Sequence, residues 1–80
     1  MPDLMTQVKL LRRMPPPALA REIRRAAGVS VETVAGALGV HPMTVARWER
    51  GQRSPRGDMR VRYAELLEQM QEEVSRGATA

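Results

Sequence analysis

The side chains best suited to chemistry in this sequence are arginines, which occupy every third position from Arg47 to Arg56. A guanidinium carries a fixed positive charge and five N–H donors, which suit it to phosphate groups and to the O6 and N7 acceptors of guanine. The chain offers few residues suited to catalysis, because it contains one histidine, His41, and no cysteine. No nucleophile, acid–base pair or metal site can be assembled from what remains. The sequence therefore predicts a binding protein that is not an enzyme and needs no cofactor.

The positive charge is concentrated in the middle of the chain. The 80 residues carry a net charge of +4, and residues 15–57 hold seven arginines against three acidic residues. Residues 58–80 hold five acidic residues against three arginines. A basic surface suits the DNA backbone, and the acidic last segment is expected to point away from DNA or toward a protein partner. A charge excess of this size is also typical of an ordinary solvated surface. The helices and loops that carry the arginines therefore have to show whether the positive charge forms a DNA-binding surface.

Two short helices joined by a turn are predicted between Ser30 and Gly51. Ser30 is a good N-cap for the first helix, because its hydroxyl can accept a hydrogen bond from a free backbone N–H. Gly39 can adopt the positive φ that a helix C-terminus requires. His41 can cap the second helix weakly, and Pro42 suits its first position because the missing N–H would be unpaired there. The first helix is therefore expected to end at Gly39.

The apolar residues of this segment predict that the two helices pack against each other. Val34, Ala35 and Leu38 form one face, and Val45 and Trp48 repeat at i, i+3 toward it. Small side chains are expected where the two backbones approach, at Ala35 and Gly36. The residues left pointing outward from the second helix are Met43, Thr44, Arg47 and Arg50.

This arrangement resembles the helix-turn-helix of the Cro/CI repressor (Xre-like) family. The resemblance covers roughly residues 17–70, and its most specific features are Ala35, Gly39, Val45 and the ending Trp48-Glu49-Arg50-Gly51. It implies an all-α fold, a small bundle of four to five helices of the lambda-repressor-like type. It also implies that the second helix of the motif, residues 42–50, reads double-stranded DNA in the major groove.

The resemblance assigns roles to individual residues of this helix. Arg47 is the best candidate for reading a base, since it can donate two hydrogen bonds to guanine, although a phosphate contact is the alternative. Thr44 can donate to a phosphate or touch a thymine methyl group, and Met43 offers apolar contact or simple packing. The expected base-contacting residues are Pro42, Met43, Thr44 and Arg47. The expected contacts to the DNA backbone come from His41, Arg50, Arg53 and Arg56.

Two further positions are interpreted through the resemblance. Arg24, four residues before the turn at Gly28, is expected to form a partly buried ion pair with Glu49, which makes both residues structural. Two unpaired surface charges are the alternative. Many relatives have a phosphate-binding glutamine at the first position of the helix that begins after Ser30, but Val31 stands here and Glu32 follows it. The helix N-terminal amides are then left to bind the phosphate, or that contact is missing.

The flanking segments give the expected domain organisation. Residues 1–14 are predicted to form an amphipathic helical arm, which either covers the small core or reaches DNA with its basic residues. Three prolines, 15–17, separate this arm from a domain over residues 17–75. That domain begins with a helix over residues 18–27 whose inward residues are expected to be Leu19, Ile23, Ala26 and Ala27. Residues 76–80 are expected to be a flexible tail.

The last helix is predicted to begin after Asp58, which can cap it. Its apolar stripe is broader than one small core needs, so the far end, Met70 and Val74, is expected either to pair two copies of the chain or to fray. The N-terminus has no long apolar run typical of a signal peptide or a membrane span, which predicts a cytoplasmic protein. The residues of the stripe are Met59, Tyr63, Leu66, Leu67, Met70 and Val74.

The sequence is best interpreted as a sequence-specific DNA-binding transcriptional regulator, a small Cro-type repressor of bacterial or phage origin. Its partners would be a double-stranded DNA operator and a second copy bound through the C-terminal helix, without a membrane or a small-molecule substrate. One alternative is a DNA-binding accessory factor, such as an antitoxin or an excisionase-like protein. Another is a protein-binding module that kept the fold but lost DNA affinity, which the valine at position 31 supports. Its docking surface would be the acidic face of Glu65, Glu68, Glu72 and Glu73.

Overall fold

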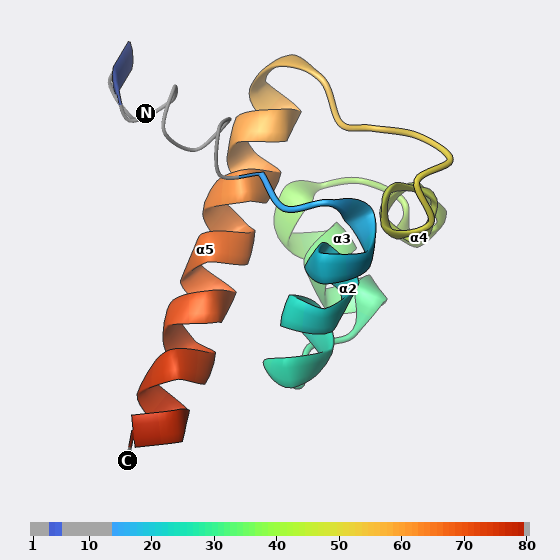
Figure 1. Cartoon of the computed structure of the whole chain (residues 1–80). Coiled ribbons are helices and arrows are strands. Elements are labelled where there is room, and N and C mark those ends of the chain that lie inside the picture. Colours follow the sequence, from blue (N-terminus) through green and yellow to red (C-terminus); the bar gives the residue numbers. More distant parts are fainter. Residues whose placement is uncertain (1–3, 6–13, 80) are drawn as a thin grey trace.

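The computed structural model describes residues 4–5 and 14–79, and this part of the chain contains helices and no strand. The helices are α2 (Pro17–Ala26), α3 (Val31–Leu38), α4 (Pro42–Glu49) and α5 (Gly57–Thr79). Figure 1 shows α5 running along one side of the molecule, with the three shorter helices gathered beside it. The predicted all-α bundle is therefore confirmed. The expected N-terminal arm lies outside the described residues, apart from Leu4, Met5 and Met14.

The helix ends follow from local chemistry. Ser30 Oγ accepts a hydrogen bond from the Thr33 backbone N–H at 3.1 Å, as its N-cap position predicts. Gly39 closes α3 with φ of 71°, which a residue with a side chain rarely adopts. The Met43 N–H donates to His41 Nδ1 at 3.0 Å, and Pro42 occupies the first turn of α4. The sequence rules for capping therefore place the ends of both helices correctly.

The core lies between α5 and the three shorter helices. Val45 of α4 is completely buried, and Trp48 packs its ring against Tyr63 of α5 with the ring centroids 4.8 Å apart. The contact between Trp48 and Tyr63 joins α4 to α5. The buried apolar residues that form one cluster are Ala20, Ile23, Val34, Ala35, Leu38, Val45, Trp48, Tyr63, Leu67 and Met70.

The inward face of α2 differs from the prediction. Ala20 and Ile23 are buried, whereas Leu19 is 47% exposed and Ala26 is also exposed. Ala27 is half-buried and follows the end of the helix. A small alanine allows α2 to lie close to its neighbours, so the core takes the face that carries Ala20, although the larger apolar residue is beside it.

The last helix also departs from the prediction at both ends. It begins at Gly57, so Asp58 lies in its first turn and favours the helix through its negative charge near the N-terminus. It continues to Thr79, which makes residues 76–79 part of α5 where a tail was expected. No proline interrupts this segment, and Gly77 costs a helix interior only about 1 kcal/mol. Although α5 is 23 residues long, no helix in the described ranges is long and apolar enough to cross a membrane.

Tyr63 brings a polar atom into the core. Its hydroxyl is buried and has no hydrogen-bond partner among the described residues. Because burial of such a group without a partner costs about 1–3 kcal/mol, we expect Tyr63→Phe to leave the free energy of unfolding unchanged or to raise it slightly. Thermal unfolding followed by the fluorescence of Trp48, the one tryptophan of the chain, measures this. A marked loss of stability would mean that the hydroxyl has a partner in solution.

The same residue predicts a dependence of stability on alkaline pH. Burial and the negative charge of Glu49 raise the pKa of Tyr63 from 10.0 to about 12, although the positive charge of Arg24 acts in the opposite direction. The folded protein then retains a proton that the unfolded chain loses above about pH 10. Stability is therefore expected to be unaffected by this group below about pH 10 and to fall as the pH approaches 12. Phenolate absorbance reports the titration directly, since Tyr63 is the one tyrosine, and Tyr63→Phe should remove its contribution.

Candidate nucleic-acid interface

The interface is built on the packing of α3 against α4. Ala35 is 1% exposed, and its carbonyl accepts a hydrogen bond from the Val40 N–H at 3.0 Å, which closes the turn between the helices. A small residue is therefore needed at Ala35, as the sequence predicts. Gly36 differs from the prediction, because it is exposed and a side chain added there would meet open space. The close approach of the two helices depends on Ala35 and not on Gly36.

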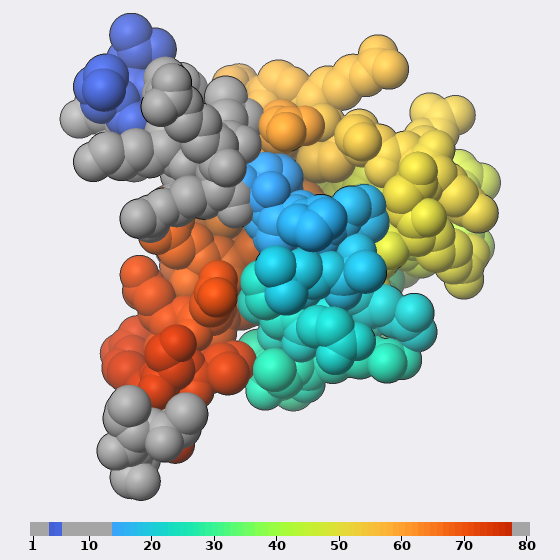
Figure 2. Space-filling model, in the orientation of Figure 1, coloured from blue at the N-terminus to red at the C-terminus, as the bar shows by residue number. Residues whose placement is uncertain are grey.

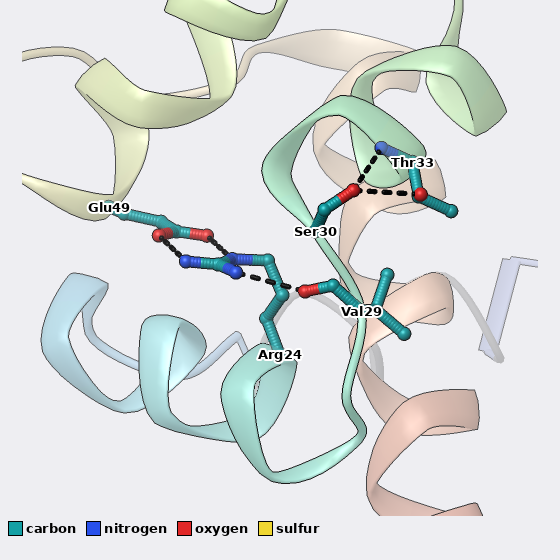
Figure 3. A network of polar contacts seen from close by, with 5 residues as sticks. All are labelled: Arg24, Val29, Ser30, Thr33 and Glu49. Carbon is teal, nitrogen blue, oxygen red and sulfur yellow. Dashed lines mark hydrogen bonds and ion pairs between the residues drawn. The ribbon is translucent and has the colours of Figure 1, made fainter.

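An ion pair joins α2 to the end of α4. Arg24 Nε donates to Glu49 Oε2 at 2.6 Å, and Arg24 Nη2 donates to Glu49 Oε1 at 3.0 Å. The third guanidinium nitrogen, Nη1, donates to the backbone carbonyl of Val29 at 2.9 Å, as Figure 3 shows. The side chains are only 12% and 5% exposed, respectively. Arg24 therefore connects α4 to the loop that leads into α3, and both residues are engaged inside the protein.

The electrostatics of this pair follow from its geometry. The hydrogen bonds to Glu49 raise the pKa of Arg24, and partial burial opposes this effect. Two parallel hydrogen bonds between a planar guanidinium and a carboxylate fix the relative orientation of the two groups as well as the distance between them. The contact to Val29 was not predicted, because a backbone carbonyl leaves no signal in the sequence pattern.

The outward face of α4 presents one apolar residue and two arginines. Met43 is 47% exposed, and Arg47 and Arg50 are also exposed. Met43 and Arg47 are four residues apart, so they lie one above the other on the same helix face. The one acidic residue of α4, Glu49, is paired with Arg24 on the inner side. The charge and the hydrogen-bond donors of this face therefore suit a partner that offers hydrogen-bond acceptors and negative charge.

Thr44 and Pro42 lie nearer the edges of this face. Both side chains are half-buried. Thr44 lines a cleft between α4 and the loop that follows it, and Met59 of α5 also lines this cleft. The remaining residues of this cleft come from α4 and the loop, and they are Trp48, Gln52, Arg53, Ser54, Pro55 and Arg56. Of the expected base-contacting residues, the structure thus presents Met43 and Arg47 most fully.

The loop after α4 is held against the helix end by its backbone. The N–H of Gln52 donates to the carbonyl of Arg47 at 3.0 Å, and the N–H of Gly51 donates to that of Trp48 at 3.1 Å. Arg53 and Arg56 are exposed and line the cleft, together with the polar residues Gln52 and Ser54, which were not predicted as site residues. His41 is also exposed, at the start of α4. Donors of this kind suit the phosphate backbone of DNA.

The start of α3 lacks a polar side chain at its first position. Val31 is half-buried and packs against the core, so its side chain serves the fold. Glu32 beside it is exposed and negatively charged, and the hydroxyl of Ser30 is engaged in capping the helix. The described residues also contain no group of three or more histidine, aspartate or glutamate side chains that could hold a metal ion.

The arginines of α4 and the loop after it lie far from the C-terminal end of α5 (Figure 2). Figure 2 shows α4 and the loop after it, in yellow, at the side far from the C-terminal end of α5, in red. The acidic residues Glu65, Glu72 and Glu73 are exposed on α5. A DNA duplex bound at α4 would therefore meet the arginines of α4 and its loop and not the acidic end of α5.

The comparison with family models identifies this architecture. A model described as Helix-turn-helix matches residues 21–69, which span most of α2, all of α3 and α4, and the first part of α5. A search of curated proteins and a search of solved structures found no significant match. The matched region includes the Arg24–Glu49 pair and the outward face of α4. The chain belongs to the Cro/CI (Xre-like) family of helix-turn-helix DNA-binding regulators.

Proposed function

We propose that this protein is a sequence-specific repressor of Cro type, of bacterial or phage origin, which binds an operator in the cytoplasm and excludes RNA polymerase from it. The observation that carries this proposal is the outward face of α4. Ion pairing of Glu49 with Arg24 leaves that face with exposed Met43, Arg47 and Arg50 and no acidic side chain. An α-helix with such a face fits the major groove of DNA.

The proposed contacts divide into two classes. Arg47 and Met43 meet base edges most directly, while Thr44 and Pro42 approach them from the margins of the helix face. The phosphate contacts fix the position of the protein and carry affinity, and the base contacts carry sequence preference. The proposed residues for the DNA backbone are His41, Arg50, Arg53 and Arg56, all of which are exposed.

We also propose that two copies bind together through α5. Met70 is only 7% exposed and belongs to the core of a single chain, so it is not available for pairing. Val74 is half-buried, and α5 continues beyond it to Thr79, which leaves this end of the helix as the proposed contact. Sedimentation at increasing protein concentration, with and without DNA, tests the pairing. A monomer bound to a single half-site would contradict it.

The presence of an apolar residue, Val31, at the first position of α3 favours a second candidate function, that of a protein-binding module of the same fold. The side chain of Val31 is apolar and packs against the core, so it cannot bind phosphate, and the negative charge of Glu32 repels phosphate. The exposed acidic residues of α5 would then be the docking surface. A DNA-binding accessory factor would keep the interface of α4 but would act in recombination or toxin control.

Selection from random duplex DNA by the purified protein, at near-physiological salt, distinguishes these candidates. The proposed function predicts a short motif, and pairing of two copies predicts a palindrome with half-sites about one helical turn apart. Binding without a motif, with affinity that falls steeply as salt rises, would favour the accessory role. Absence of binding to any duplex would contradict both DNA-binding roles and favour the protein-binding module.

A further inference from the structure

Met43 is an apolar side chain placed among the arginines of the outward face of α4. It is 47% exposed, whereas Val45 and Trp48 of the same helix are 0% and 6% exposed. The other exposed large apolar residues in the described part of the chain are Leu4, Met5 and Leu19, which lie outside α3 and α4. The helix that faces DNA therefore presents one apolar group, in its first turn, where the core does not need it.

The major groove of DNA offers one apolar group of its own, the C5-methyl group of thymine. Met43 lies one helical turn before Arg47, so a duplex whose guanine meets Arg47 places a neighbouring base pair against Met43. The methionine side chain is unbranched and polarizable, which allows it to adapt to a small methyl group. Thr44 also carries a methyl group, but its side chain is half-buried and lines the neighbouring cleft, so less of it is open to a base edge than of Met43.

We propose that Met43 binds the C5-methyl group of a pyrimidine next to the guanine bound by Arg47, so that DNA binding depends on that methyl group. This inference rests on the proposed function, because it requires α4 to lie in the major groove. It has a regulatory consequence. Since 5-methylcytosine carries its methyl group at the same ring position as thymine, and a thioether makes no strong hydrogen bond to O4 or N4, Met43 accepts either base. Cytosine methylation at this position then strengthens binding.

The test uses the motif selected by the wild-type protein and changes one methyl group at a time. Duplexes carry thymine, uracil, cytosine or 5-methylcytosine at each pyrimidine position of the motif in turn. At one position next to a guanine, we expect uracil in place of thymine to weaken wild-type binding about four-fold, and methylation of cytosine to strengthen binding by a similar factor.

Two variants assign the effect to one side chain. Met43→Ala is expected to bind the methylated and unmethylated duplexes of each pair with equal affinity. Leu19→Ala is the matched control, because Leu19 is also 47% exposed but belongs to α2 and not to α4 or the loop that follows it. It should retain the full dependence on the methyl group. Both replaced side chains are exposed, so the fluorescence of Trp48 should show unchanged folding.

The outcomes separate this inference from the proposed function. Equal wild-type affinity for thymine and uracil at every position, with the motif still preferred over random DNA, overturns the role of Met43 alone. Dependence on a methyl group that persists in Met43→Ala overturns it as well. If the wild-type protein selects no motif, both the inference and the proposed function are wrong.

Discussion

Replacing Glu49 with alanine is expected to lower the free energy of unfolding by about 3–5 kcal/mol, the largest effect predicted for this protein. Glu49 receives two hydrogen bonds from Arg24, and its side chain is 5% exposed. Its removal leaves a guanidinium partly buried with the Val29 carbonyl as its remaining acceptor in this network. Since a domain of this size is stable by about 5–15 kcal/mol, such a loss is a large part of the total.

Thermal unfolding followed by circular dichroism and by Trp48 fluorescence measures this effect. A loss of 3 kcal/mol should lower Tm by more than about 10 °C in a domain of 80 residues. The matched control is Glu72→Ala, because Glu72 is an exposed glutamate of α5 and its removal should change stability by less than about 0.5 kcal/mol. Should the Glu49→Ala variant fail to fold, Glu49→Gln keeps the shape of the side chain and removes only the charge. Equal Tm values for wild type, Glu49→Gln and Glu72→Ala would contradict a stabilising ion pair.

Replacing Arg47 with alanine is expected to reduce the preference for the motif strongly while general affinity for DNA remains. A bidentate contact to guanine contributes about 1–3 kcal/mol of discrimination, which corresponds to a loss of about 5-fold to 150-fold in preference for the motif. The exposed arginines Arg50, Arg53 and Arg56 remain in the variant and continue to attract phosphate. Competition between the motif and random DNA at a fixed salt concentration measures the preference.

The control for this prediction is Arg25→Ala, which removes the same charge from an exposed position on α2. It should leave the preference for the motif unchanged. Arg47 would instead be a phosphate contact if its replacement weakened binding to every duplex by the same factor. In that case the slope of log affinity against log salt concentration should become less steep by about the contribution of one phosphate contact.

The parts of the fold that could be predicted from the sequence are those decided by local chemistry. Capping by Ser30 and His41 and the positive φ of Gly39 depend on neighbouring backbone groups, so residue type and spacing were sufficient. The choice between Leu19 and Ala20 depends on how closely α2 approaches the other helices, which periodicity does not show. Met70 illustrates the same limit. Its position in the stripe was evident, but its burial within one chain depends on tertiary packing.

The features of the candidate site also separate into those that could be predicted from the sequence and those that could not. The exposed face with Met43 and Arg47 follows from helical spacing once Val45 and Trp48 are assigned to the core. The pairing of Arg24 with Glu49 could be expected only through the family resemblance, since the residues are 25 positions apart. Neither spacing nor resemblance indicated the contact from Arg24 to the Val29 carbonyl or the buried hydroxyl of Tyr63, which has no hydrogen-bond partner within residues 4–5 and 14–79. Such contacts depend on backbone atoms and on the exact depth of burial.

We propose that α4 reads bases in the major groove through Arg47, and guanine N7 is the most direct place to test this role. In the selected motif, each guanine is replaced in turn by 7-deazaguanine, which lacks the N7 acceptor and keeps the base pair. We predict that one such replacement per half-site weakens wild-type binding but has no further effect on the Arg47→Ala variant. Equal wild-type affinity for every substituted duplex would contradict the claim, as would an equal loss in the Arg47→Ala variant.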